Sequence, residues 1–367
     1  MYLDLSWVRL GVVLASEEYS PQELVRHGVE AEKSGLDVVW GSDHFHPWFD
    51  TGAHGVFIWS ALSAVGALTK KIIMGTSVTC PLFRYPPPIV AQAFATMQNL
   101  FPSRMFLGVG TGEALNEVPC GFTWPSYRER LERLEEAVFI IRLLWLGRQV
   151  TYRGKYYGVV KAKLYDPPPS SIPIHIASSG VRGAKLAGAL ADAFMTLPVD
   201  DHTVYTQKLF PALDKGAREV GRTGEEIEKS ILVHVGYHEQ DRERALKSLL
   251  PWRGTLLPIF FDLNIYDPRY IEMHGNRVSE KLVEEVFLVA TKADDITTYL
   301  EKYLRLGFRH IAFSVSGDPI GFIKMLGSEI APYLREEYGQ PPTPYIGSYS
   351  REHFEKYMES RGIKLEL

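Results

Sequence analysis

Cysteine is scarce in this sequence, and it has no long hydrophobic runs and no marked excess of one charge. Two cysteines, Cys80 and Cys120, among 367 residues are too few for a disulfide framework and fit a reducing compartment. With a formal net charge of −4 and no dense basic stripe, the chain is not expected to bind nucleic acid. No apolar stretch approaches the ~18 to 20 residues that span a bilayer, so no membrane partner is expected.

The start of the chain also lacks the features of a secretory signal. "MYLDLSWVRLGVVLAS" has no charged start, no long apolar run and no small-residue cleavage site, which predicts a cytoplasmic protein. At 46% hydrophobic residues, a chain of this length can bury a substantial core.

Short apolar strands alternate with longer amphipathic helices along most of the chain. Segments such as "RLGVVLA", "KIIMGTSVT" and "IPIHIASSG" read as buried strands, and each is followed by a helical pattern. Eight such repeats predict an α/β fold, a (β/α)8 TIM barrel with insertions. The alternative is a doubly wound open sheet, which the absence of a "GxGxxG" opening disfavours. We expect a single domain over 1–338, insertions near 148–166 and 250–292, and a C-terminal extension over 339–367.

Acid–base residues crowd the predicted mouth of the barrel, where the strands end and active sites of this fold lie. Glu17 follows the first strand, "GSDHFHPWF" (41–49) follows the second, and "GTGEALNE" follows the fourth. A metal site at His44 and His46 is disfavoured, because residues two apart at a strand end point to opposite faces and no further ligand cluster supports them. Alternatively, these residues have only a structural role, in which Asp43 caps the following turn and His46 shapes the loop.

Two glycine-rich segments suggest where a phosphorylated ligand binds. "GVGTGEALNE" lets backbone amides approach a ligand closely, and "SSGVRGAKLAG" precedes a helix whose first N–H groups could hold a phosphate. Alternatively, these glycines only let a strand turn into a helix. Together the segments indicate a large, planar, phosphorylated ligand across the mouth.

Four segments carry a resemblance to a known family. "SDHFHPW", "TSVTCPLFRYPPPIVAQAFATM", "FPSRMFLGVGTGEALNEVPCG" and "WPSYRERLERLEEAV" resemble the coenzyme F420-dependent dehydrogenases of the bacterial luciferase-like superfamily. The resemblance runs from about residue 9 to 335 and leaves out the tail from residue 340. It implies a (β/α)8 barrel, a homodimer and F420, a deazaflavin, as the cofactor.

The resemblance also implies roles for individual residues. His44 would take the proton of a substrate hydroxyl, with Glu17 near it, while Trp48 would stabilise the transition state and Glu113 would face the ring nitrogen that gains electron density. Histidine suits this task because its ordinary pKa lies near neutrality. Cofactor binding is expected of the following residues: Asp43, Thr76, Ser77, Val78, Thr111, Gly112, Glu113, Asn116, Ser178, Ser179 and Gly180. The family also has a non-proline cis peptide bond that matches Ser77–Val78.

The segments that match the family's substrate site distinguish between its branches. Where the glucose-6-phosphate dehydrogenases hold the sugar phosphate with basic residues, this chain reads "MTLPVDDHTVY", "FFDLNIYD" and "LVEEVFLV". Asp200 and Asp201 would repel a phosphate. The insertion "PWRGTLLPIFFDLNIYDPRYIEMHGN" looks like that of the secondary-alcohol dehydrogenases, with Phe260 and Phe261 as candidate walls; these aromatics could equally be ordinary core. The predicted substrate pocket comprises Trp48, Thr196, Trp252 and Thr255.

The prediction is therefore an F420-dependent alcohol dehydrogenase with a small-molecule alcohol as substrate and no metal. The alternatives are an F420-dependent dehydrogenase of sugars or sugar phosphates, an F420-dependent pterin reductase, an FMN-dependent luciferase-like monooxygenase, and a non-enzymatic F420-binding protein.

Overall fold

The chain divides into two compact units, which are described in turn from a computed structural model that describes residues 7–363. The first unit takes in the residues up to Ser77, Glu113–Trp124 and Ile231–Pro342. The second takes in Val78–Gly112, Pro125–Ser230 and the residues from Thr343 on. Among the helices of residues 7–363, none is long and apolar enough to cross a membrane.

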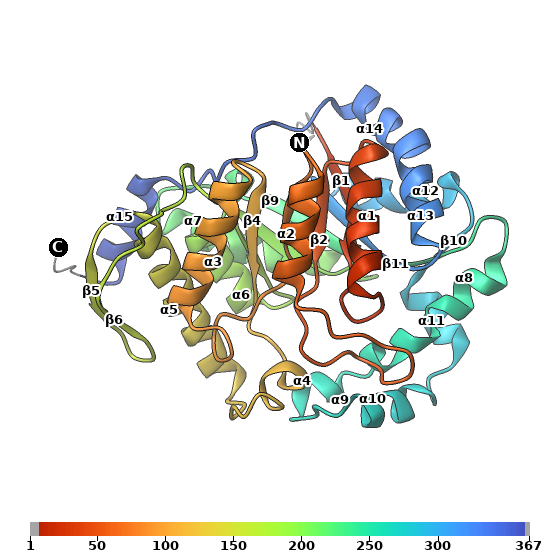
Figure 1. Ribbon diagram of the computed structural model, residues 1–367, viewed down its shortest axis with the longest axis horizontal. Helices are drawn as coiled ribbons and strands as arrows, with labels where there is room; N and C mark the ends of the chain where they lie inside the picture. The colour runs from red at the N-terminus through yellow and green to blue at the C-terminus, as the bar shows by residue number, and fades with distance from the viewer. Residues whose placement is uncertain (1–6, 364–367) are drawn as a thin grey trace. The chain divides into compact units, whose positions relative to one another are not determined.

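Parallel strands form the centre of the first unit. Their order is β10 (Leu288–Ala290), β9 (Glu228–Tyr237), β11 (His310–Gly317), β1 (Arg9–Leu14), β2 (Val38–Gly41) and β3 (Ile73–Thr76), and the first residues of β9 belong to the second unit. All six residues of β1 are buried, as is typical of a parallel strand covered on both faces. Figure 1 shows α1 (Pro21–Lys33) and α2 (Ile58–Leu68) side by side in front of β1 and β2.

Local sequence signals set the ends of these helices. Helix α1 begins with a capping box, in which Ser20 accepts from the backbone of Glu23 and the Glu23 carboxylate accepts from the backbone N–H of Ser20. Pro21 occupies its first turn, and Gly35, with φ of 79°, follows its end. The last helices of the unit are α12 (Ala293–Leu304), α13 (Pro319–Met325) and α14 (Ala331–Tyr338), with a π-helical turn, η4 (Leu326–Ile330), between α13 and α14.

The long insertion predicted over 250–292 has its own helices. Preceded by α8 (Arg242–Ser248), it contains a 3₁₀ segment, η3 (Leu250–Leu256), and the helices α9 (Ile259–Asp262), α10 (Pro268–Gly275) and α11 (Glu280–Val286). It also contains β10, a strand that periodicity missed because it is only three residues long. The short α4 (Ala114–Glu117) was missed likewise.

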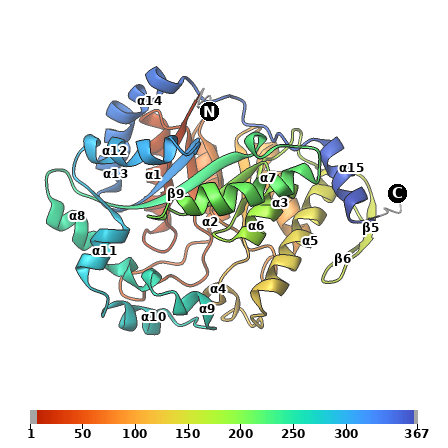
Figure 2. The same ribbon diagram turned by 180° about the vertical axis from the view of Figure 1, so that it is seen from behind.

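The second unit has the parallel order β4 (Met105–Val109), β7 (Ile174–Ala177) and β8 (Ala193–Thr196). Its helices are α3 (Pro87–Leu100), α5 (Tyr127–Trp145), α6 (Val181–Leu190) and α7 (Phe210–Arg218), with a π-helical turn, η1 (Val204–Leu209), before α7 and a 3₁₀ turn, η2 (Gly224–Glu226), after it. The predicted β-rich insertion forms the antiparallel pair β5 (Val150–Arg153) and β6 (Gly158–Ala162). In Figure 2, α6 and α7 lie along each other; a Cβ at Gly188 would meet the Leu213 carbonyl at 2.0 Å, so only glycine allows this approach.

The C-terminal extension is firmly attached to the second unit. Its helix α15 (Arg351–Ser360) packs on α5 through stacked Phe354 and Phe139, and Tyr357 donates to the Glu135 carboxylate at 2.7 Å. Ahead of α15, the backbone N–H of Tyr349 donates to Asp192 at 2.7 Å.

Asp192 is the buried charge on which this attachment depends. Its carboxylate accepts from the Arg142 guanidinium at 2.8 Å and from the backbone N–H of Ile174 at 2.8 Å, besides that of Tyr349. Burial disfavours its ionised form, but Arg142 and the backbone donors outweigh burial and lower the pKa of Asp192. The carboxylate therefore stabilises the folded state above its ordinary pKa.

Asp192→Asn should lower the free energy of unfolding by about 3 to 5 kcal/mol, because it leaves the Arg142 charge buried and unpaired. Urea denaturation at neutral pH measures this. The difference from the wild type should shrink as the pH falls from about 5 to about 3, since acid removes the same charge from the wild type. Glu352→Gln, an exposed change in the same extension, is the control and should cost less than about 1 kcal/mol.

Candidate functional site

The first unit brings the ends of β1 and β2 together at one edge. The strands are parallel, and Leu14 pairs with Gly41, so the residues after each strand emerge side by side. Gly41 is required here, because a Cβ would meet the Ile58 side chain of α2 at 2.3 Å. Glu17 and His44 consequently meet, as the order of the predicted strands implied.

Glu17 is a buried carboxylate fixed by hydroxyl groups. Its side chain is 2% exposed, and Oε2 accepts from the hydroxyls of Ser42 and of Ser16, the latter at 3.2 Å. Ser42 also accepts from the Ser16 backbone N–H at 2.8 Å. The loop after β1 and the loop after β2 are thus joined by the group that fixes Glu17.

His44 lies between the Glu17 carboxylate and the backbone carbonyl of His46. Its Nε2 is 3.3 Å from Glu17 Oε1, and its Nδ1 is 3.1 Å from the backbone oxygen of His46. With the ring proton on Nδ1 donated to His46, Nε2 can accept a proton, and Glu17 stabilises the positive charge that results. The ring is nearly buried, so this pairing is little screened by solvent.

Asn116 in α4 connects three parts of the site. Its Oδ1 accepts from the backbone N–H groups of Phe45, at 2.8 Å, and His46, at 3.3 Å. Its Nδ2 donates to the Glu113 carboxylate at 3.0 Å and lies 3.3 Å from His44 Nδ1. Asn116 therefore fixes the loop that carries His44 and holds Glu113 near it.

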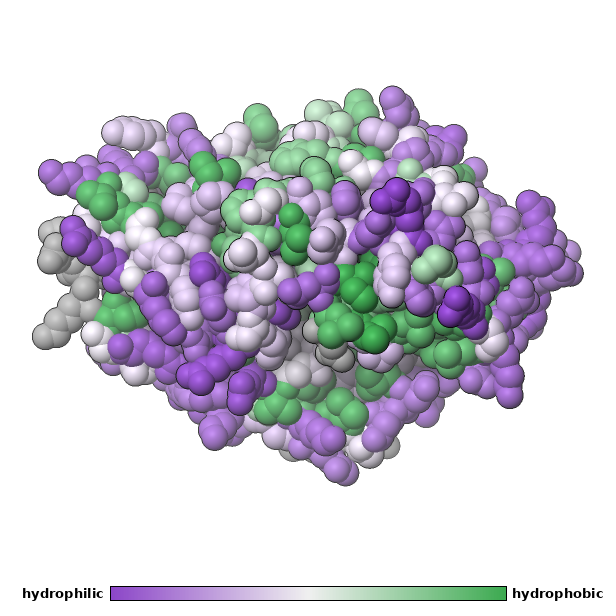
Figure 3. Space-filling view, turned by 90° about the horizontal axis from the view of Figure 1, so that it is seen from below, coloured by the Kyte–Doolittle hydropathy of each residue, from purple (hydrophilic) through white to green (hydrophobic). Residues whose placement is uncertain are grey.

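Aromatic side chains form an apolar wall in the same unit. Trp48 is 6% exposed; its ring centre is 5.9 Å from that of His44 and 5.0 Å from that of Phe261. Trp252 and Phe260 are buried in the same cluster as Trp48. Apolar and aromatic residues also remain exposed on the insertion, namely Ile259, Phe261, Leu263, Tyr266, Tyr270 and Met273. Figure 3 shows apolar patches on the face of the molecule seen from below.

The other predicted residues of the first unit lie close to these strand ends. Asp43 and Thr76 are buried, and the Ser77 backbone N–H donates to the Gly41 carbonyl at 2.8 Å. The hydroxyl of Thr255 donates to the Trp252 carbonyl at 2.7 Å. The predicted cis bond at Ser77–Val78 is wrong: within residues 7–363 the cis peptide bond is Thr343–Pro344, where proline reduces the cost of the cis form.

The rest of the predicted cofactor residues belong to the second unit. Ser178 Oγ accepts from the Gly180 N–H at 3.0 Å, and Gly180 precedes α6 without a side-chain cap on the helix. Thr111 and Gly112 follow β4, where Gly112 has φ of 70°, and Thr196 ends β8 and is buried. Two further residues lie after their strands, namely Val78 and Ser179. Their part in binding stays a prediction.

The sequence reasoning gave no role to three polar residues of the site. Ser42 precedes the acidic residue of "SDH" and holds Glu17. Glu18 accepts from the Trp252 indole N–H at 2.9 Å. His234 in β9 packs its ring 5.1 Å from that of Trp252, and burial lowers its pKa to about 4. A histidine inside the otherwise apolar run "SILVHVGYH" is the sequence signal that could have pointed to His234.

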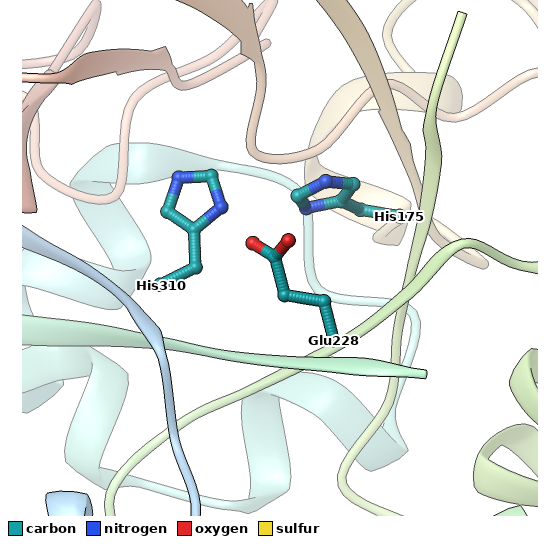
Figure 4. A group of neighbouring side chains, drawn as sticks. All are labelled: His175, Glu228 and His310. Carbon is teal, nitrogen blue, oxygen red and sulfur yellow. The ribbon is translucent and has the colours of Figure 1, made fainter. Parts of the chain in front are cut away.

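Two histidines at the opposite ends of the strands, His175 and His310, are labelled in Figure 4, and each has a structural partner. In the first unit, His310 begins β11 and its Nε2 accepts from the Trp40 indole at 2.9 Å. In the second unit, the Tyr345 hydroxyl lies 2.6 Å from His175 Nε2 and 3.5 Å from the Glu228 carboxylate. In a barrel, this N-terminal end serves stability, whereas chemistry takes place at the other end.

Comparison with known proteins identifies the family. The family described as luciferase-like monooxygenase matches residues 6–310. The chain belongs to this family. Its fold is therefore the closed parallel (β/α)8 barrel, as predicted.

This luciferase-like chain has relatives that are named for F420. It is 41% identical over 332 residues to the F420-dependent glucose-6-phosphate dehydrogenase of Microbacterium testaceum, which covers 90% of this chain and 98% of the relative. It is 38% identical over 331 residues to that of Mycobacterium tuberculosis, with coverage of 89% and 98%. A solved structure, an F420-dependent secondary alcohol dehydrogenase in complex with an F420–acetone adduct, matches with a TM-score of 0.85 and 35% identity over 90% of this chain and 99% of that one.

Asn116→Ala should accelerate hydrogen exchange at the Phe45 amide about tenfold, because one hydrogen bond contributes roughly 0.5 to 1.5 kcal/mol. Exchange measured by mass spectrometry or NMR tests this. The Ser77 amide, bonded to Gly41, is the internal control and should not change. Unchanged exchange at Phe45 would show that Asn116 does not fix this loop.

Proposed function

We propose that this protein is an F420-dependent dehydrogenase that oxidises the CH–OH group of an alcohol, with His44 as the base. The observation that supports this is the position of His44 Nε2, 3.3 Å from a buried carboxylate that stabilises the imidazolium. Coenzyme F420 is the cofactor indicated by the relatives, which are F420-dependent at 38 to 41% identity.

The chemistry of the side chains assigned to the cofactor suits a deazaflavin. Glu113 and Asn116, joined at 3.0 Å, offer a carboxylate acceptor and an amide to polar ring edges, while Asp43 and Thr76 are buried, the former after β2 and the latter at the end of β3. In the second unit, taken by itself, Ser178–Gly180 suits a phosphate group, because α6 begins with no side-chain cap on its N–H groups. When bound, F420 supplies the hydride acceptor that no side chain provides.

Residues of the chain take up the proton that the substrate hydroxyl releases. Oxidation of a CH–OH group to a carbonyl releases one hydride and one proton, and His44 Nε2 takes the proton from the hydroxyl. Glu17 stabilises the imidazolium, and Ser16 and Ser42 keep Glu17 in place. Trp48, nearly buried beside His44, excludes water from the reacting hydroxyl.

An unphosphorylated alcohol is the substrate class that the first unit supports. The walls near His44 are Trp48, Trp252, Phe260 and Phe261. The arginines that flank these walls already have partners, since Arg253 donates to Asn276 at 2.6 Å and Arg269 pairs with Asp267 at 2.8 Å. Apolar walls of this kind favour a secondary alcohol such as the one named for the matching solved structure.

Glucose 6-phosphate, or a related sugar phosphate, is the second candidate. The curated relatives at 38 to 41% identity carry this name, and their identity exceeds the 35% of the secondary alcohol dehydrogenase. This reading requires a phosphate site outside the segments where basic residues were expected. The homodimer implied by the resemblance also stays a prediction.

His44→Ala should lower kcat by roughly 10² to 10⁴-fold and leave F420 affinity within about threefold, because it removes the base and no group assigned to the cofactor. Steady-state kinetics and a coenzyme titration measure both. His46→Ala is the matched control: this half-buried ring contacts the Tyr266 carbonyl, and kcat should change less than about threefold. Wild-type turnover in His44→Ala would reject the base assignment.

Oxidised F420 mixed with the protein should lose its visible absorbance with isopropanol or longer secondary alcohols and keep it with glucose 6-phosphate. Each substrate is tried under the same conditions. Reduction with glucose 6-phosphate alone would refute the alcohol and establish the second candidate. Binding of F420 without reduction by any of them would refute both substrate classes.

A further inference from the structure

Glu18 is a second carboxyl group at the end of β1, and it contacts the apolar wall instead of His44. Its Oε2 accepts from the Trp252 indole N–H at 2.9 Å and from the Ser316 hydroxyl at 2.8 Å. Its Oε1 lies 3.3 Å from the Tyr19 hydroxyl. Glu18 thus ties Trp252, in the insertion, to the strand ends of β1 and β11.

The hydrogen-bond partners of Glu18 match a protonated carboxylic acid. Tyr19 has a single hydroxyl proton and lies closer to the Val315 carbonyl, at 2.8 Å, than to Glu18. When Tyr19 donates its hydroxyl proton in a hydrogen bond to Val315, its oxygen can accept a hydrogen bond from the protonated Oε1 of Glu18. Oε2 then accepts from Trp252 and Ser316, and each of these contacts has one donor and one acceptor.

The surroundings of Glu18 also favour the neutral form. Burial raises the pKa of Glu18 to about 7 against the opposing effect of its hydrogen bonds, and the charge of neighbouring Glu17 adds to the increase. The groups that face its partners bring no cation at neutral pH: burial lowers the pKa of His234, against Trp252, and that of His27, against Tyr19, to about 4 each. Asp318 adds a further negative charge near Tyr19.

Ionisation of Glu18 would disrupt this arrangement of hydrogen-bond donors and acceptors. Without its proton, Glu18 Oε1 faces the Tyr19 oxygen as one acceptor against another, unless Tyr19 leaves the Val315 carbonyl. Either the carboxylate turns towards water or Tyr19 moves, and the Trp252 indole, bonded to the same carboxyl group, moves with it. Because the Trp252 ring packs on Phe49 and His234, its movement also displaces the apolar wall of the site.

We propose that Glu18 is a positioning residue of the substrate pocket, which holds Trp252 in place as a protonated acid and shifts it when the acid ionises. The hold on Trp252 is independent of the reaction, whereas its effect on substrate rests on the proposed function. Glu18→Gln mimics the protonated acid, because its amide can donate to Tyr19 while its oxygen accepts from Trp252 and Ser316.

The test uses the full chain without cofactor, labelled with ¹⁵N at its seven tryptophans. Trp252→Phe identifies the Trp252 indole signal, which is then followed from about pH 5.5 to about pH 8.5. In the wild type the signal should shift with a midpoint near neutrality, and in Glu18→Gln it should stay constant. Glu301→Gln, an acid of α12 that pairs with Arg305, is the control and should titrate like the wild type. A constant signal in the wild type, or the same shift in Glu18→Gln, would overturn the proposal.

Kinetics then test the effect on the pocket. Between about pH 6 and about pH 8.5 the wild-type KM for the alcohol should rise roughly fivefold, while that of Glu18→Gln should change less than about twofold. The pH dependence of kcat should be the same in both proteins. If Trp252 titrates and the two KM profiles coincide, Glu18 has no part in substrate positioning. If no alcohol is oxidised, the proposed function fails, while the NMR result still decides whether Glu18 holds Trp252.

Discussion

The site depends on a buried negative charge, the Glu17 carboxylate, held beside a histidine. A buried carboxylate is costly unless hydrogen bonds and a partner charge compensate it. Ser16 and Ser42 supply the hydrogen bonds, and His44 supplies a charge when it is protonated. These groups meet because β1 and β2 are paired in register, which in turn requires that residue 41 be glycine. The chemistry thus rests on backbone pairing.

Two neighbouring carboxyl groups have different surroundings. Glu17 has hydroxyl donors and a histidine, while Glu18 has an indole, a serine and a tyrosine whose proton is engaged elsewhere. Consecutive residues of a loop point in different directions, so one turn places an acid on each side. In the function that we propose, Glu17 serves the reacting hydroxyl, and Glu18 serves the wall that receives the rest of the substrate.

Much of the fold and of the site could be predicted from the sequence. The eight barrel strands and the helices between them have strong periodicity, and Glu17, His44, Trp48, Glu113 and Asn116 do gather in the first unit. The role of Ser42 could not be predicted, because a serine hydroxyl has no pattern of its own. The three-residue β10 and the four-residue α4 are too short to show a periodic pattern of apolar residues. The cis bond came from resemblance alone, and the backbone does not have it.

The attachment of the C-terminal extension has a consequence for how the chain is made. The second unit is discontinuous: Asp192 and Glu135 take partners, Tyr349 and Tyr357, that are synthesised more than a hundred residues after them. On the ribosome, β4, β7 and β8 emerge early, yet the surroundings of the buried Arg142–Asp192 ion pair are complete only once Tyr349 of the extension has been made. Domains that close early can fold during synthesis, whereas this unit reaches its final packing only after the extension has left the ribosome.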